Sequence, residues 1–108
     1  MKTVQVSPSD NWLYALIESL KDSQEAADYL TVVLEDDPKT DQILRHTLKD
    51  IITAKRQAND LSEEAIREYN KIEELFEHNG GEEIYTFLRL LKTLGFCLKV
   101  ECDAEGTA

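Results

Sequence analysis

Carboxylates dominate the side chains that could do chemistry in this sequence. Twenty-two acids against 12 bases give the 108-residue chain a formal net charge of -10. Nine of the acids, but only two bases, lie between Asn59 and Tyr85, so this segment carries a net charge of -7. Within it, the spacing of LSEEAIREYNKIEELFEHNGG at 61–81 suggests a helix-turn-helix. Its charge, however, repels phosphate and attracts basic partners.

We find no pattern that indicates an enzyme. The sequence has no nucleophile with a base signature, no glycine-rich phosphate loop after a strand and no paired ligands four residues apart. Neighbouring acids such as Glu73 and Glu74 diverge by about 100° around a helix, so they cannot share a substrate atom. We therefore expect no catalytic residue and no cofactor.

The two cysteines do not indicate a metal site or a disulfide scaffold. Cys97 and Cys102 are not in a metal-ligand spacing with His46 or His78. We expect reduced thiols and no bound metal. No stretch approaches the ~18 apolar residues of a membrane span, and the start, MKTVQVSPSD, lacks the apolar core of a signal peptide. The expected location is the cytoplasm, without a membrane partner.

Helical periodicity organises the first half of the chain. A helix is predicted at 11–20, and a second one is capped by Asp22 or Ser23 and ended by Asp37-Pro38. A third helix begins near Thr40 and has the strongest amphipathic pattern. The apolar residues of these helices are Trp12, Leu13, Leu16, Ile17, Leu20, Ala26, Ala27, Leu30, Val33, Leu34, Ile43, Leu44, Leu48, Ile51, Ile52 and Ala54.

Two short helices and a tight turn are predicted next. Ser62 caps a helix at 63–68, Tyr69-Asn70 forms the turn, and a further helix covers 71–78. Asn79-Gly80-Gly81 ends that helix, because glycine adopts a positive φ without strain. The last predicted helix, 82–94, ends at Gly95.

Alternating residues predict one short strand at each end of the chain. Lys2–Ser7 and Phe96–Val100 alternate in the manner of strands, and the two would most economically pair with each other. The predicted fold is mainly α, with five to six helices and a short two-stranded sheet. One domain would cover 1–100, and 101–108 would be a flexible tail.

Three stretches resemble the bacterial addiction-module antidote (antitoxin) family. They are LKDSQEAADYLTVVLEDD at 20–37, TLKDIITAKRQ at 47–57 and LLKTLGFCLKV at 90–100. Members of that family carry a lambda-repressor-like (Cro/C1-type) helix-turn-helix, which would fall at about 61–79. The family's turn holds a glycine, whereas this chain has Tyr69-Asn70 there.

The resemblance implies a DNA-binding transcriptional regulator that acts as the antitoxin of a toxin-antitoxin module. It would bind operator DNA as a homodimer. The outward positions of its recognition helix fall on Tyr69, Asn70, Lys71, Glu73 and Glu74. Arg67 and Lys71 would contact phosphates, with help from Lys49, Lys55 and Arg56 on the preceding helix.

The second interpretation is an acidic protein-interaction module that has lost DNA binding. The family's toxins are typically small basic ribonucleases, and an acidic chain would associate quickly with such a partner. Glu73, Glu74 and Glu77 are the candidate partner-binding residues. The sequence leaves both interpretations open.

Overall fold

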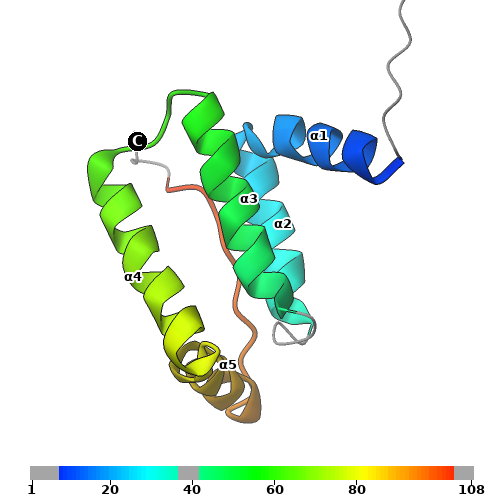
Figure 1. Cartoon of the computed structure of the whole chain (residues 1–108). Coiled ribbons are helices and arrows are strands. Elements are labelled where there is room, and N and C mark those ends of the chain that lie inside the picture. The colour runs from blue at the N-terminus through cyan, green and yellow to red at the C-terminus, as the bar shows by residue number, and fades with distance from the viewer. Residues whose placement is uncertain (1–7, 37–41, 104–108) are drawn as a thin grey trace, which may run out of the picture.

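Five α-helices make up the regular structure of the residues that the computed structural model describes, 8–36 and 42–103. They are α1 (Pro8–Leu20), α2 (Ser23–Glu35), α3 (Ile43–Gln57), α4 (Glu63–Asn79) and α5 (Glu82–Thr93). Helices α1 and α2 both contact α3, and α4 contacts α3 and α5. In Figure 1, α1 projects sideways from one end of the α2–α3 pair. The mainly α prediction is confirmed.

Side-chain and glycine caps set several helix boundaries as predicted. The Asp22 carboxylate accepts hydrogen bonds from the backbone N–H groups of Gln24 and Glu25, at 2.9 and 3.1 Å, and so caps α2. Ser62 caps α4 by accepting from the Ala65 N–H at 3.0 Å. Gly80 then ends α4 in the left-handed conformation.

The core consists of two hydrophobic clusters. The first joins α1, α2 and α3 through Ile17, Leu20, Ala26 and Ala54. The second joins the end of α2 and the start of α3 to the α4–α5 hairpin, and its buried members are Val33, Leu44, Phe76 and Tyr85. The α4–α5 hairpin therefore depends on the second cluster for its attachment.

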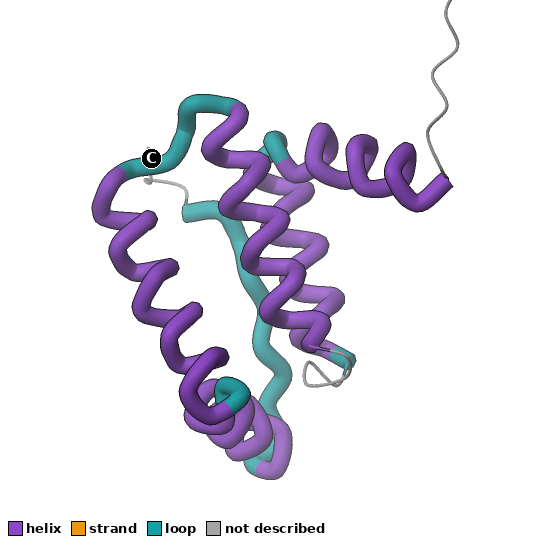
Figure 2. Tube along the Cα trace, in the orientation of Figure 1, coloured by secondary structure: helices purple, strands orange, loops and turns teal. Residues whose placement is uncertain are grey.

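The predicted turn inside 61–79 is wrong, because α4 is one continuous helix of 17 residues (Figure 2). Neither glycine nor proline interrupts Glu63–Asn79, and Asn70 in an exposed helical position costs only about 0.7 kcal/mol relative to alanine. Tyr69 is half-buried, and its hydroxyl donates to Glu73 one turn later. The tyrosine thus belongs to the inner face of the helix, although its polar group breaks the apolar pattern.

The predicted two-stranded sheet is not supported. Residues 96–100 form no strand; they are a loop, and the other predicted strand, 2–7, lies outside the described residues. This loop lies against α2. The Thr31 hydroxyl holds it by accepting from the Val100 N–H at 2.8 Å, and lies 3.1 Å from the Val100 carbonyl. A threonine side chain on a helix has therefore taken the place of the expected strand partner.

No helix in the described ranges has the length and apolar character needed to cross a membrane.

Candidate interaction surface

Arg45, Glu73 and Tyr69 form a polar network that joins α3 to α4. The Arg45 guanidinium donates to both carboxylate oxygens of Glu73, with its terminal nitrogen 2.7 Å from Oε1. Tyr69 donates to Glu73 Oε2 at 2.9 Å. The guanidinium carbon also lies 5.7 Å from the centroid of the Phe76 ring. Two of the sequence-predicted site residues, Tyr69 and Glu73, are therefore committed to holding α4 on α3.

The network shifts the pKa values of its members in the directions expected for a stable ion pair. Hydrogen bonding from Arg45 lowers the pKa of Glu73 below its ordinary value. Burial, together with the hydrogen bond to Glu73, raises the pKa of Tyr69 to about 12. Glu73 is thus an anion and Tyr69 a neutral donor at neutral pH, as the network requires.

The bases that were expected to contact DNA from α4 share a surface with acids. Arg67, Asn70 and Lys71 are exposed, and their spacing places them on one outward face. Glu74 lies three residues beyond Lys71 on that face, and Lys71 itself pairs with Glu68 at 3.3 Å. The outward face of α4 is therefore not a basic surface.

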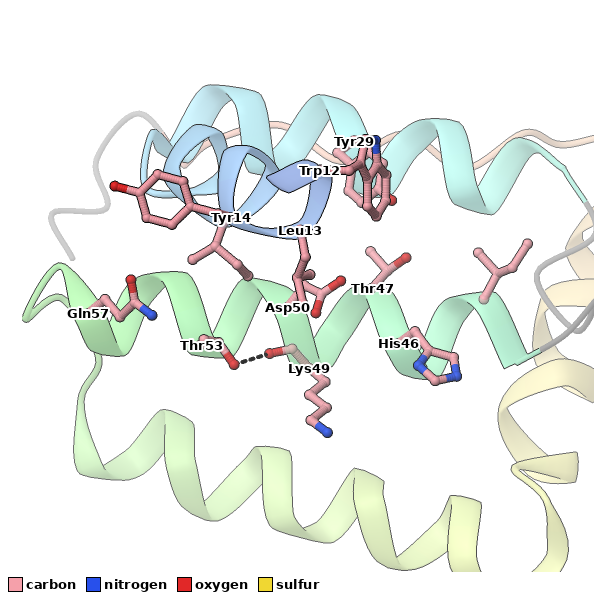
Figure 3. A pocket seen from close by; sticks show the side chains of 12 residues that line it. Trp12, Leu13, Tyr14, Tyr29, His46, Thr47, Lys49, Asp50, Thr53 and Gln57 are labelled. Carbon is pink, nitrogen blue, oxygen red and sulfur yellow. Dashed lines mark hydrogen bonds between the residues drawn. The ribbon is translucent and has the colours of Figure 1, made fainter. Parts of the chain in front are cut away.

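The two lysines expected to help from α3 do not extend that surface. Lys55 lies 3.2 Å from the Ser23 hydroxyl and 3.4 Å from the Asp60 carboxylate, so it joins α3 to the start of α2. Lys49 points from α3 toward α4 (Figure 3). Six residues separate the two lysines, which places them about 120° apart around α3. The structure does not bring the predicted DNA-binding residues together on one face: they are Arg67, Tyr69, Asn70, Lys71, Lys49 and Lys55.

Two of the three predicted partner-binding acids remain accessible. Glu74 is exposed, and Glu77 is 73% exposed with only a 3.4 Å contact to Arg45. Further exposed acids on α4 are Glu63, Glu64 and Glu68. The outer surface of α4 consequently presents more carboxylates than bases to an approaching molecule.

A groove of about 810 Å³ lies beside the α1–α3 contact and is lined by residues of both helices (Figure 3). On the α1 side it is lined by Trp12, Leu13 and Tyr14, which are 60%, 44% and 69% exposed. The sequence predicted α1 correctly, but Trp12 and Leu13 were expected on its apolar face with Ile17 and Leu20. Within residues 11–20 of α1, neighbouring helices bury Ile17 and Leu20, whereas Trp12 and Tyr14 stay in solvent. Large exposed aromatic side chains in a concave site are typical of protein-binding surfaces.

One carboxylate lies inside this groove. Asp50 is half-buried and lies on the side of α3 that faces α1, beside Leu13 (Figure 3). Burial raises the pKa of Asp50, and the nearby His46 and Lys49 side chains only partly oppose the shift. Among the described residues, none donates a hydrogen bond to this carboxylate or forms an ion pair with it within 4.0 Å.

A second apolar strip follows α5. Phe87, Leu90 and Leu94 are each more than half exposed and recur at helical spacing. Beyond it, Cys97 and Cys102 are exposed free thiols. No cluster of three or more histidine, cysteine or acidic side chains in the described ranges could hold a metal ion.

Sequence reasoning missed Arg45 and the α1–α3 groove. The spacing of Glu73 and Glu77, four residues apart, places both on one face and could have indicated a basic partner. Nothing local to Arg45 identifies it as that partner, because 28 residues separate it from Glu73. The groove depends on the angle between α1 and α3, which no sequence pattern specifies.

Comparisons with known proteins found no match to any family model, curated protein or solved structure. The resemblance to the antidote family therefore stays a prediction.

Proposed function

We propose that this chain is an acidic protein-binding module that captures a small basic protein, in the manner of an antitoxin that neutralises its toxin. The observation that carries the proposal is the unbroken helix α4. A helix-turn-helix needs a second helix set at an angle to the first, so that its start can enter the major groove. A single straight helix with exposed acids provides a surface for a basic protein instead.

Electrostatics supports the same partner class. A net charge of -10 steers a basic protein toward the chain and raises its association rate, most strongly at low salt. Because the partner of an antitoxin is typically a basic ribonuclease, an acidic surface also competes with RNA phosphates. This role needs neither DNA contact nor catalysis.

The resemblance also implies operator binding. For this function the structure offers no single surface of basic side chains among the residues that the sequence predicts. Neutralising the phosphate charge requires cations, and of the predicted contributors Lys55 and Lys71 are paired with acids of this chain. DNA binding, the homodimer and the cytoplasmic location remain predictions. The same experiment can test the first two.

The test compares two ligands for the purified chain. One is the protein encoded by the neighbouring gene, which the proposal requires to be small and basic, and the other is a labelled duplex from its own upstream region, with an unrelated duplex as control. We expect a stable complex with the protein, whose mass counts the copies of each chain, and no sequence-specific binding to DNA at moderate salt. Specific operator binding without capture of the basic protein would contradict the proposal.

Charge reversal tests which surface steers the partner. Glu64→Lys with Glu74→Lys on α4 should slow association about tenfold at low salt, with less effect at high salt. Asp28→Lys with Glu35→Lys changes the net charge equally on α2 and serves as the control. Equal slowing by both pairs would assign the effect to overall charge rather than to α4.

A further inference from the structure

The α1–α3 groove combines an apolar wall with one carboxylate, Asp50, that no described residue pairs with. Trp12, Leu13 and Tyr14 form the wall on α1, and Asp50 lies on the opposite side, on α3 (Figure 3). An apolar surface alone would accept many ligands. The half-buried Asp50 carboxylate also requires a hydrogen-bond donor from the ligand. A ligand that covers the carboxylate without a donor would bind more weakly, because desolvating an unpaired anion is unfavourable. The groove therefore selects a cationic group carried on an apolar segment.

Arginine fits this site better than lysine. Its planar guanidinium donates two parallel hydrogen bonds to a carboxylate and can also stack on an aromatic face. Trp12 and Tyr14 supply exposed aromatic faces on the wall that Asp50 looks toward. His46 and Lys49 are the other titratable groups that line the groove; Lys49 points toward α4, and neither forms an ion pair with Asp50 within 4.0 Å.

Both walls of the groove are helices, which decides the backbone conformation of the ligand. Helix backbones have already paired their own N–H and C=O groups, so an extended peptide would find no backbone partners there. A helix satisfies its own backbone and presents only side chains. The groove extends from Ile43 to Gln57, about 21 Å along α3 at 1.5 Å per residue, which accommodates roughly four helical turns.

We propose that the α1–α3 groove holds a basic amphipathic helix of the partner protein, with an arginine guanidinium beside Asp50 and apolar side chains against Trp12, Leu13 and Tyr14. This inference rests on the proposed function and assigns it an anchoring site. The acidic face of α4 would increase the association rate of the basic partner. The groove would act on the lifetime of the complex, since buried contacts chiefly determine dissociation.

Trp12 is the only tryptophan in the sequence, so its fluorescence reports on the groove directly. The probe is a synthetic, tryptophan-free helical peptide of about 15 residues with arginine and leucine on one face. A matched peptide carries glutamine in place of each arginine. We expect the arginine peptide to change the Trp12 emission saturably, with one peptide per chain, and the glutamine peptide to bind at least about tenfold more weakly.

Variants of the full chain then locate the site. Asp50→Asn should raise the Kd of the arginine peptide about tenfold, and Tyr14→Ala by a similar factor. Glu83→Gln, on an exposed position of α5, removes the same charge at a distance from the groove and should leave the Kd almost unchanged. Asp50→Asn should be at least as stable as the parent chain, because it removes a half-buried unpaired charge, so weaker binding cannot be attributed to unfolding.

Three results would overturn the inference. The first is an equal Kd of the arginine peptide for Asp50→Asn and Glu83→Gln. The second is the absence of a saturable change in Trp12 emission when the peptide is added. The third is a Trp12 emission that changes with protein concentration when no peptide is present. The last result would mean that a second copy fills the groove. If the peptide leaves Trp12 unaffected while the native basic protein is still captured, the groove is wrong and the proposed function stands. If the native protein is not captured either, both fail.

Discussion

Glu73 receives hydrogen bonds from two helices at once. Arg45 reaches it from α3, and Tyr69 reaches it from one turn earlier on α4. The Arg45 and Glu73 side chains are 27% and 26% exposed, so water screens the pair only in part. Glu73, which the sequence analysis names as a candidate for partner binding, thus stabilises the contact between α3 and α4. In the proposed function, partner binding would depend on the exposed acids around it.

Replacing this carboxylate should weaken the fold. Glu73→Gln should lower the free energy of unfolding by about 1 kcal/mol, since it removes the anion that Arg45 and Tyr69 share while solvent screening limits the loss. Chemical denaturation of the parent chain and the variant measures the difference. Glu64→Gln, an exposed acid on the same helix, should change stability much less. Equal effects would mean that the network contributes nothing specific.

The same variant should change the response to acid. Because Arg45 lowers the pKa of Glu73 below 4.5, the stabilisation is present above about pH 4.5 and is lost as pH falls through the folded-state value. The free energy of unfolding of the parent chain should therefore fall more steeply below pH 4.5 than that of Glu73→Gln. Parallel pH profiles would show that Glu73 has the same pKa in the folded and unfolded chains.

At the scale of the element, α4 holds the main difference between expectation and structure. The four other helices follow from apolar spacing and capping residues: Asp22 begins α2 and Gly80 separates α4 from α5. The continuity of α4 could not be read in the same way, because Tyr69 joins the inner face through a hydroxyl that needs Glu73 and Arg45. The end of the chain was misjudged for a similar reason. An alternating pattern at 96–100 does not reveal that a hydroxyl at Thr31 holds it.

Substitutions at Asn70 distinguish a continuous helix from a turn. In the exposed middle of α4, Asn70→Ala should raise the free energy of unfolding by about 0.7 kcal/mol, and Asn70→Gly should lower it by roughly 0.3 kcal/mol. In a left-handed turn the signs reverse, since alanine is strained there and glycine is not. Chemical denaturation of both variants provides the comparison, and a stabilising Asn70→Gly would contradict the helix.

The connection between α4 and α5 gives a second test at this scale. Gly80 and Gly81 both have positive φ, but a Cβ on Gly81 would lie 2.6 Å from Phe76 Cδ1, whereas one on Gly80 would have no heavy atom within 4 Å. Gly80→Ala should therefore cost about 1 kcal/mol for its backbone strain alone. Gly81→Ala should cost more, about 3 kcal/mol, because it also displaces a core ring. Thermal unfolding of the pair should rank them in that order; the opposite ranking would refute the packing of Phe76 over Gly81.

At the scale of the whole molecule, acids outnumber bases so strongly that the chain repels itself. The ion pairs that join its elements, such as Arg45 with Glu73 and Lys55 with Asp60, oppose this repulsion locally. Salt screens both the repulsion between like charges and the attraction within ion pairs. The effect of salt on stability therefore depends on which of the two contributes more to the free energy of unfolding. With a formal net charge of -10, repulsion should dominate.

Raising NaCl from about 0.01 to 0.15 M shortens the Debye length from about 30 to 8 Å and should therefore stabilise the chain. We expect the free energy of unfolding to rise by roughly 0.5–1 kcal/mol, measured by urea denaturation at each salt concentration. A matched series in a buffer with sucrose at equal osmolality separates screening from solute exclusion. A fall in stability with salt would show that the ion pairs outweigh the net charge.

The two core clusters impose an order on how the chain can be built during synthesis. The buried residues of the first cluster, from Ile17 to Ala54, all precede α4, so this cluster can close before α4 leaves the ribosome. The second cluster must wait for Phe76 and Tyr85, and the loop that Thr31 holds at Val100 comes last. A nascent chain paused after α3 would therefore already display the α1–α3 groove, while the acidic helix α4 was still missing. If the two proposed roles hold, a partner made nearby would meet the proposed anchoring site before the proposed steering surface exists.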